Sequence, residues 1–455
     1  MDELRFSCVF EWRYGSREMR ELFTAESMVK KLLDVEIALL RGLEEAGFAE
    51  RGCAEAIKSC VEEITAREVY ELEAKIGHDI AALAQIAGDR CGPCGRFFHL
   101  GATSYDIVDT AWALILRDAL AIVKNRLARV IDVLSELALR EAETLMAGRT
   151  HGQHAVPITL GFKLANFAYE LSRGLERILD AERRLVRCKI SGAVGTMAAW
   201  KDRGLVVEET ACSSLGLEPH AITTQVAPRD GFAEIATALA ILASQLDRLA
   251  LEVRELSRTE IGELSEGEER VGSSTMPQKR NPVTAERVSG LARIARSLSI
   301  AALENIVLMH ERDLTNSSAE RVLIPHLLLT VDQMLIDTER MLKSLVVDRE
   351  AMARNLELTR GAIMAESVMM KLVEKGVPRH RAHAIIREVL RKTGGDESFA
   401  NALQKDPVIS SLLTPDEIRE SLDYKSYLGS YRQLVARALE YARRVADLAK
   451  ASSHR

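Results

Sequence analysis

The chain has 455 residues and a net charge of −6, with 61 lysines and arginines against 67 aspartates and glutamates. This mildly acidic chain, only 5% aromatic, lacks the clustered basic charge and the base-stacking platforms of most nucleic-acid-binding proteins, so we expect no nucleic-acid partner. It is longer than one ordinary domain, and its 10 prolines and 27 glycines are so few that we predict a mostly helical protein.

The N-terminus carries charged residues where a signal peptide needs an apolar core. No stretch of the chain reaches the roughly 18 consecutive apolar residues of a membrane span. We therefore expect a soluble, cytoplasmic protein without a membrane partner.

Residues 1–104 are expected to form a small N-terminal helical domain, because short amphipathic stretches there alternate with glycines. The chain's seven cysteines lie at positions 8, 53, 60, 91, 94, 188 and 212, an odd count that argues against a secreted disulfide framework. Cys91 and Cys94 share a Cys-Gly-Pro-Cys turn, but His99 alone does not supply the further ligands that a zinc site needs. We expect inert loop thiols. Redox or metal chemistry is the alternative, as is a local disulfide if the source is a hyperthermophile.

Residues 105–355 are expected to form a central bundle of long helices. Positions 102–147 contain neither glycine nor proline, and their apolar residues recur at helical spacing, which predicts a helix roughly 60 Å long. Further stretches without glycine or proline cover 175–191, 232–261, 291–324 and 326–360. Helices this long belong to a bundle, a coiled coil or a solenoid, and the absence of a fixed-period repeat favours the bundle.

Residues 356–455 are expected to form a C-terminal helical domain of shorter helices, because glycines and prolines again separate the apolar stretches. The expected fold class is therefore all-α, with three helical domains and a long central bundle.

Polar residues and glycines interrupt the long-helix pattern at three places, where we expect the chemistry to lie. The first is HLGATSYD at 99–106, just before the first long helix. Its hydroxyls and its acid suit a helix cap. The free N–H groups of a helix N-terminus also suit a bound carboxylate, so a cap and an anion site both stay open.

The second interruption is GRTHGQHAVP at 148–157. His151 stands between two glycines, and an imidazole with an ordinary pKa of about 6.5 can act as an acid or a base near neutral pH. A loop histidine hydrogen-bonded to the backbone is the alternative. His154 follows without a third ligand, so we expect no metal site.

The third interruption is GSSTMPQKRNP at 272–282. A glycine opens it, two prolines fix it, and it combines hydroxyls with Lys279 and Arg280. This combination suits the binding and polarisation of a carboxylate better than it suits a plain connector. The segment matches neither a P-loop nor the nucleophile elbow of a hydrolase.

This third segment resembles the signature loop of the fumarase/aspartase superfamily, whose members eliminate fumarate from a succinyl-bearing substrate. The other two interruptions resemble the remaining two site segments of that superfamily, in the same chain order. Several segments resemble the adenylosuccinate lyase family in particular: Arg13-Tyr14, Gly77-His78-Asp79, the run HERDLTNSSAER at 310–321, and Lys279-Arg280-Asn281-Pro282.

The resemblance implies roles for individual residues. His151 matches the general acid, Ser273 the general base and Glu286 the acid that orients the histidine, while Lys279 stabilises the intermediate. The implied substrate-binding residues are Arg13, Tyr14, His78, Asp79, His99, Thr103, Ser104, Gln225, Asn281, Arg312, Ser317 and Arg321. It also implies a nucleotide substrate, no cofactor, and a homotetramer whose active sites are shared between subunits.

The chain departs from the family pattern in places. Gly77 stands where the family usually has arginine, Gln278 replaces a common histidine, and the approach to the loop at 266–271 is unusually acidic. Another superfamily lyase, such as 3-carboxymuconate cycloisomerase or argininosuccinate lyase, is the alternative function. The alternative from a different functional class is a structural or binding protein that keeps the lyase fold but catalyses no reaction.

Overall fold

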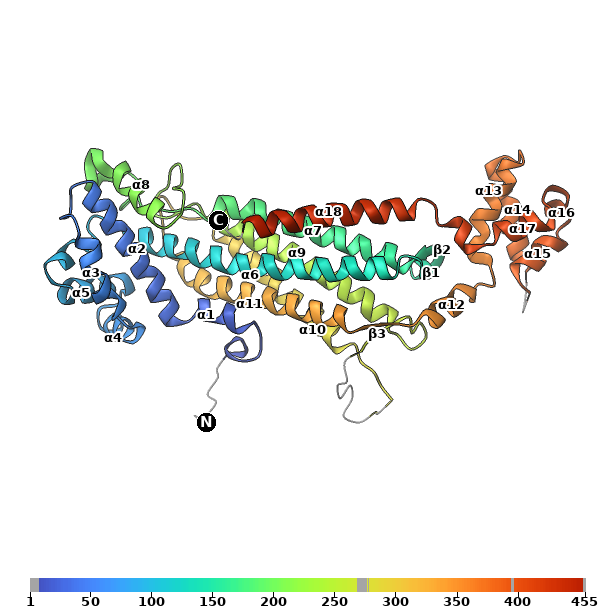
Figure 1. The fold of residues 1–455 in the computed structure, drawn as a ribbon, viewed down its shortest axis with the longest axis horizontal. Coiled ribbons are helices and arrows are strands. Elements are labelled where there is room, and N and C mark those ends of the chain that lie inside the picture. The colour runs from blue at the N-terminus through green and yellow to red at the C-terminus, as the bar shows by residue number, and fades with distance from the viewer. Residues whose placement is uncertain (1–7, 268–275, 277, 394–396, 453–455) are drawn as a thin grey trace.

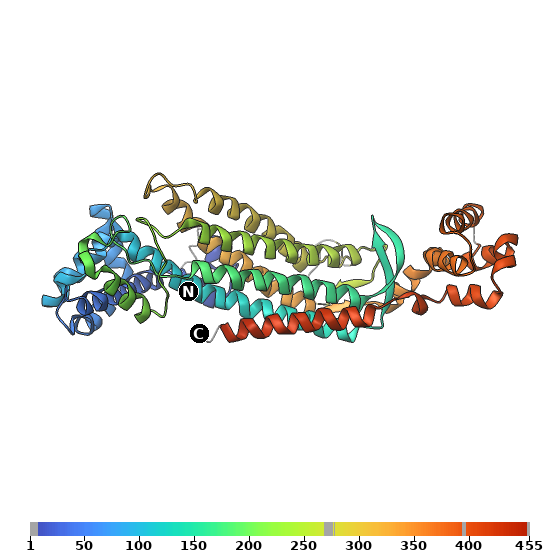
Figure 2. The ribbon, with the colours of Figure 1, turned by 90° about the horizontal axis from the view of Figure 1, so that it is seen from above.

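The computed structural model describes residues 8–267, 276, 278–393 and 397–452. The molecule is elongated, with a central bundle of long helices between two smaller helical bodies (Figure 1). The view turned by 90° shows the same three parts in line (Figure 2). The expected all-α class is confirmed, since only four short strands accompany the helices in the described part of the chain.

The N-terminal body packs short helices around one apolar core that includes Leu39, Ile57 and Leu83. Val207 and Ala211 enter the same core from later in the chain. Its elements are α2 (Ala25–Glu45), α3 (Cys53–Glu62), α4 (Ala66–Ile76), α5 (Asp79–Arg90), η2 (Gly92–Phe97), η3 (Ala198–Arg203) and α8 (Gly204–Ser214). Before them, η1 (Val9–Glu11) and α1 (Arg17–Leu22) pack against the core of the bundle.

Three disulfides crosslink this body, so the expectation of inert loop thiols is wrong. Cys53 of α3 is bonded to Cys94 of η2, Cys60 of α3 to Cys91 at the end of α5, and Cys188 to Cys212 of α8. Cys8 is the one free cysteine. The alternative of a local disulfide at the Cys91–Cys94 turn is wrong as well, because both cysteines are bonded to α3 and all three disulfides join cysteines that are 24 to 41 residues apart.

Long helices form the bundle around a continuous apolar core. They are α6 (Ser104–Arg140), α7 (Leu160–Leu185), α9 (Arg229–Leu256), α10 (Val283–Glu304), α11 (Thr315–Lys343) and α18 (Tyr431–Ser452). An antiparallel hairpin of β1 (Leu145–Thr150) and β2 (Gln153–Thr159) follows α6, and β3 (Leu264–Glu266) pairs antiparallel with β4 (Leu345–Val347).

The bundle differs from the sequence expectation around 291–324 and 326–360. The break falls at 305–314, which has neither glycine nor proline, whereas α11 continues through Pro325. Proline removes one backbone hydrogen bond from a helix interior. Packing of α11 against both α10 and α6 maintains the helix across that gap.

The C-terminal body has its own small core, which includes Val368, Phe399 and Leu403. Its elements are α12 (Arg349–Glu357), η4 (Ala362–Met364), α13 (Ala365–Glu374), α14 (Arg379–Lys392), α15 (Phe399–Lys405), α16 (Pro407–Leu412), α17 (Pro415–Ser421) and η5 (Tyr424–Tyr427). The last helix, α18, returns to pack on α7 and α6. The division at 1–104, 105–355 and 356–455 stays a prediction. No helix in the described ranges is both long and apolar enough to cross a membrane.

Candidate active site

The segment at 99–106 forms the N-terminus of α6. Thr103 is the N-cap, with a capping box to Asp106, whose Oδ2 accepts the Thr103 N–H at 2.8 Å. The cap interpretation is therefore confirmed. Asp106 does more than cap, because it is fully buried and its Oδ1 accepts from Lys189 Nζ at 2.5 Å and from the Ser191 N–H at 2.8 Å.

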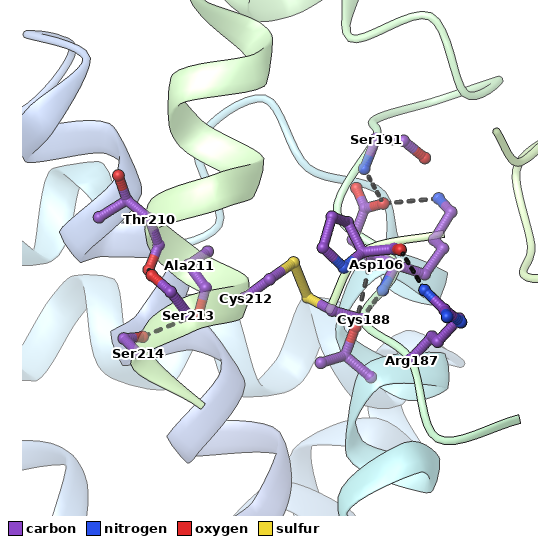
Figure 3. Close-up of a disulfide and its surroundings, with 12 residues drawn as sticks. Asp106, Arg187, Cys188, Ser191, Thr210, Ala211, Cys212, Ser213 and Ser214 are labelled. Carbon is purple, nitrogen blue, oxygen red and sulfur yellow. Dashed lines mark hydrogen bonds and ion pairs between the residues drawn. A yellow bond between two sulfur atoms is a disulfide. The ribbon is translucent and has the colours of Figure 1, made fainter. Parts of the chain in front are cut away.

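The loop that follows α7 is thereby fixed to the start of α6. Figure 3 shows Ser191 beside Asp106, with the Cys188–Cys212 disulfide tying the same loop to α8. Ser191 Oγ lies 2.7 Å from Thr223 Oγ1, which extends the connection to the loop that carries Gln225. A buried ion pair, a disulfide and backbone hydrogen bonds thus join three distant segments around the α6 N-terminus.

Several predicted substrate residues meet in a cavity of about 430 Å³ at this end of the bundle. His78, the N-cap of α5, accepts the Ala81 N–H at Nδ1, so its Nε2 carries the proton that faces Ser104 Oγ at 3.3 Å. The lining residues are Glu73, Gly77, His78, Asp79, Ser104, Tyr105, Val108, Arg312, Leu314, Ser317, Ser318 and Arg321.

Two arginines from the run at 310–321 line this cavity, together with the acids Glu73 and Asp79. Arg321, on α11, donates to Asp79 at 3.1 Å. The Arg312 guanidinium lies over the Tyr105 ring, 3.6 Å from its centroid, and donates to Gln225 Oε1 at 3.1 Å. Arg312 Nε is buried without a hydrogen-bond partner among the described residues.

A buried ion-pair network supports the cavity, and sequence reasoning missed it. Arg229 of α9 pairs with Asp109 of α6 and with Glu320 of α11, and all three side chains are nearly inaccessible. Burial, opposed by the charge of Arg229, raises the pKa of Glu320. Asp109 also accepts the Ala227 N–H at 2.7 Å, which fixes the end of the Gln225 loop. A sequence signal existed, because Asp109 interrupts an apolar helix face.

His99 lies next to this end of α6, on a backbone with a φ of 58°. Its Nδ1 is 2.6 Å from Glu36 Oε1 on α2, a partner that no sequence motif indicated. The glycine that replaces the family's arginine, Gly77, ends α4 in the left-handed region with a φ of 77°. A residue with a side chain would be strained there.

His151 occupies the tip of the β1–β2 hairpin. Thr150 pairs with Gln153, so His151 and Gly152 form a two-residue turn, and both have positive φ, 56° and 73°. This is the geometry of a type I′ hairpin turn. The side chain is exposed at the tip. The hairpin itself is held by Arg149, whose guanidinium pairs with the buried Glu263.

The third segment lies only partly within the described residues, and Ser273 lies outside them. Lys279 and Asn281 are described and precede α10, while Glu286 is exposed in its first turn. Glu266 caps this helix, because its carboxylate accepts the Thr284 N–H at 3.1 Å and the Ala285 N–H at 2.8 Å. The acidic approach to the loop therefore has a structural role at Glu266.

Arg13 and Tyr14 lie apart from the cavity. The next residues, Gly15 and Ser16, donate backbone N–H groups to Gln333 and Asp332 of α11 at 3.0 and 2.6 Å. Tyr14 packs against the apolar core of the bundle and lies close enough to Arg287 of α10, which follows Glu286 in the chain, to influence the pKa of that arginine. Tyr14 thus lies near the α10 segment rather than beside Arg321.

One chain does not bring all the predicted residues together. The 37 residues of α6, which begin at Ser104 and end at Arg140, span roughly 55 Å, and the hairpin follows at the far end. Figure 1 shows the hairpin and the N-terminal body at opposite ends of the bundle. His151 therefore lies far from His78 and Ser104 of its own chain.

The described residues contain no group of three or more histidines, cysteines or acids arranged to hold a metal ion. The polar groups of the cavity are hydroxyls, one imidazole, two guanidinium groups and the carboxylates of Glu73 and Asp79. The hydroxyls and the guanidinium groups suit the anionic oxygens of an organic substrate. The N-terminus of α6 acts in the same direction.

Comparisons with known proteins agree with this arrangement. The family described as "Lyase" matches residues 13–296. The crystal structure of 3-carboxy-cis,cis-muconate lactonizing enzyme from Pseudomonas putida superposes with a TM-score of 0.87 at 32% identity, covering 96% of this chain and 99% of that one. Fold and sequence together define a lyase of the fumarase/aspartase superfamily.

Relatives with higher sequence identity show which family of this superfamily the chain belongs to. The adenylosuccinate lyase of Pyrococcus abyssi is 43% identical over 436 residues, or 95% of this chain and 97% of that protein. The adenylosuccinate lyase of Methanothermobacter thermautotrophicus is also 43% identical, over 94% of this chain and 97% of that protein. The family described as "Adenylosuccinate lyase C-terminus" matches residues 361–438. The chain belongs to the adenylosuccinate lyase family.

Proposed function

We propose that the protein eliminates fumarate from adenylosuccinate to give AMP, and from the succinocarboxamide nucleotide of purine synthesis, SAICAR, to give AICAR. The observation that carries the proposal is the cavity at the start of α6, where Arg312, Ser317 and Arg321 gather in a member of this family. A nucleotide phosphate carries the charge that these arginines accommodate. The reaction involves no oxidation or reduction, so it needs no redox cofactor.

In the proposed mechanism, Ser273 removes a proton from the succinyl carbon β to the nitrogen. The electrons left on carbon are delocalised into the neighbouring carboxylate, which then carries two negative charges. Lys279 and Asn281 stabilise this dianion, because fixed donors and cations are most effective where charge develops. The same cationic surroundings lower the pKa of the serine hydroxyl, which is otherwise far too weak an acid to serve.

The C–N bond then breaks as His151 gives its proton to the departing nitrogen. Glu286 orients the imidazole. His78, His99, Thr103, Ser104 and Gln225 hold the succinyl part of the substrate, while the remaining proposed contacts hold the nucleotide. These nucleotide contacts are Arg13, Tyr14, Asp79, Arg312, Ser317 and Arg321.

We further propose a homotetramer in which different subunits supply different parts of one site. The separation of Ser104 from His151 along α6 supports this arrangement, since no single chain joins the two ends. So does the exposed turn that carries His151, which is free to enter a site of another subunit. Many apolar side chains are also exposed along α9, α10 and the loop after α10: Ile241, Leu251, Ile294, Ile300, Leu303, Ile306, Val307 and Met309. A surface of this kind is typical of an interface.

A panel of four substrates tests the function: adenylosuccinate, SAICAR, argininosuccinate and 3-carboxymuconate. We expect the ultraviolet absorbance to change with the first two substrates only. In the cell, we expect the enzyme to act in the cytoplasm. Arg321→Ala is expected to raise the KM for adenylosuccinate about tenfold while changing kcat less, because it removes a uniform binding contact. Turnover of argininosuccinate or 3-carboxymuconate alone would replace the proposal with the corresponding alternative.

A further inference from the structure

Glu36 and His99 form an isolated pair inside the N-terminal body. The Glu36 side chain is fully inaccessible, whereas 20% of the His99 side chain remains exposed. Oε1 of the glutamate lies 2.6 Å from Nδ1 of the histidine. The other oxygen, Oε2, is buried without a hydrogen-bond partner among the described residues. His99 is thus the only described side chain that hydrogen-bonds this carboxylate.

The backbone holds the histidine rigidly against its partner. A φ of 58° is uncommon for a residue with a side chain and persists only where surrounding contacts enforce it. The next residue, Leu100, accepts a hydrogen bond at 3.0 Å from the indole of Trp200, itself almost fully buried. A strained backbone that neighbouring contacts hold in place indicates that the orientation of the His99 imidazole matters for function.

The electrostatics of the pair favour the charged form. Burial lowers the pKa of His99, but the charge and hydrogen bond of Glu36, together with the charge of Asp106, outweigh burial, so the pKa is raised. A fully buried carboxylate also needs a cation beside it to remain ionised. Lys189 neutralises Asp106 of α6, and Glu208 of α8 lies near both. Glu36 is therefore the acid that acts on His99 directly.

We propose that Glu36 is a positioning residue that holds His99 as an imidazolium, with Nδ1–H donated to the carboxylate and Nε2–H presented to an anionic oxygen of the substrate. The inference rests on the proposed function for the identity of that oxygen, which belongs to the succinyl group. The charge increases the strength of the Nε2 hydrogen bond, because charge-assisted hydrogen bonds are roughly twice as strong as neutral ones.

Glu36→Gln tests the proposal, because it preserves the size of the side chain and an acceptor for Nδ1–H but removes the charge. We expect kcat/KM for adenylosuccinate to fall about tenfold at pH 8, mainly through KM. The kcat/KM of the variant, divided by that of the wild type, should rise toward one as the pH falls to 6. There an imidazole with an ordinary pKa of about 6.5 becomes protonated without the help of a carboxylate. Glu208→Gln, which removes a nearby acid that does not hydrogen-bond His99, is the matched control and should retain activity.

A double-mutant cycle separates positioning from a general structural role. In a His99→Gln background, Glu36→Gln should change kcat/KM less than twofold, because the group on which it acts is gone. A defect that is equal at all pH values, or that persists in the His99→Gln background, would overturn the proposal.

Imidazole titration followed by 13C NMR separates this proposal from the proposed function. We expect the His99 pKa to lie above its ordinary value in the wild type and to fall in Glu36→Gln, whatever substrate the enzyme uses. A His99 pKa that does not respond to Glu36→Gln would overturn the pairing. Absence of turnover with a normal His99 response would instead overturn only the proposed substrate.

Discussion

Arg149 and Glu263 form a two-pronged ion pair that fastens the His151 hairpin to the rest of the bundle. Arg149 Nη1 lies 2.9 Å from Oε2, and Nη2 lies 2.6 Å from Oε1. Glu263 is fully buried and also accepts from Asn355 Nδ2 at 2.7 Å. One carboxylate thus joins the hairpin, the segment before β3 and α12, so the position of the proposed acid depends on it.

Arg149→Met is expected to lower the free energy of unfolding by about 3–5 kcal/mol, because it leaves the Glu263 carboxylate buried without its cation. Urea denaturation followed by circular dichroism measures the change. Arg432→Met is the matched control, since Arg432 makes a similar two-pronged contact with Glu143 but on the surface. We expect little change there. Equal losses in the two variants would contradict the importance of the buried pair.

Arg149→Lys keeps the charge but cannot reproduce the planar two-pronged contact. We expect a folded enzyme with a kcat reduced about tenfold and a smaller change in KM, because the hairpin tip loses its fixed position. Steady-state kinetics with adenylosuccinate measures both constants. A wild-type kcat in this variant would remove Arg149 as a positioning residue for His151.

The three disulfides predict a simple thiol count. In denaturant without reductant, a thiol reagent should detect one cysteine per chain, Cys8, and after reduction all seven. Replacing Cys60 and Cys91 by serine should lower the free energy of unfolding by about 2–4 kcal/mol, since the crosslink restricts the unfolded chain. Cys8→Ser is the control and should leave stability unchanged. Seven reactive thiols before reduction would contradict the disulfides.

Glu208 predicts an unusual dependence of stability on pH. Burial first, and then the charges of Glu209 and Asp106, raise the pKa of Glu208 to about 7, against the opposing charge of Lys189. A raised folded-state pKa contributes stability at low pH that is lost as the pH rises between about 4.5 and 7. Glu208→Gln should therefore raise the melting temperature at pH 8 and have a smaller effect at pH 5. A larger effect at pH 5 would contradict this assignment.

The exposed apolar face of α10 predicts which substitution would break the proposed tetramer. Ile300 is 61% exposed on α10, and Leu205 is 62% exposed on α8 of the N-terminal body. We expect Ile300→Glu to convert the tetramer into smaller species, because a charge at an apolar interface core loses its hydration. Leu205→Glu should leave the tetramer intact. Size-exclusion chromatography with light scattering measures the mass of each variant. Equal masses of the two variants would contradict an interface at α10.

The sequence indicated the long helices and the three polar interruptions, because glycine and proline punctuate a helical chain so clearly. It misplaced the break after α10, since residues 305–314 contain neither glycine nor proline, and it did not indicate that α11 continues through Pro325. Tertiary packing decides both positions.

The supporting groups of the site were harder to predict. Asp106 and Lys189 are 83 residues apart, and Glu36 and His99 are 63 apart, so only the fold shows that they meet. The disulfides escaped prediction for the same reason. The hydroxyls, the histidine and the arginines that line the cavity were identified from motifs, as were Asp79 and Asp106. Glu36 and Lys189 lie outside every motif.

Subunit complementation tests the central claim most directly. His78→Ala and His151→Ala are each expected to be folded and nearly inactive, because each lacks one end of the proposed site. Mixing the two proteins under conditions of subunit exchange should restore about a quarter of wild-type activity, since random assortment in a symmetric tetramer leaves some sites with both histidines. Mixed tetramers that form, as shown by mass spectrometry, but recover no activity would contradict a site shared between chains.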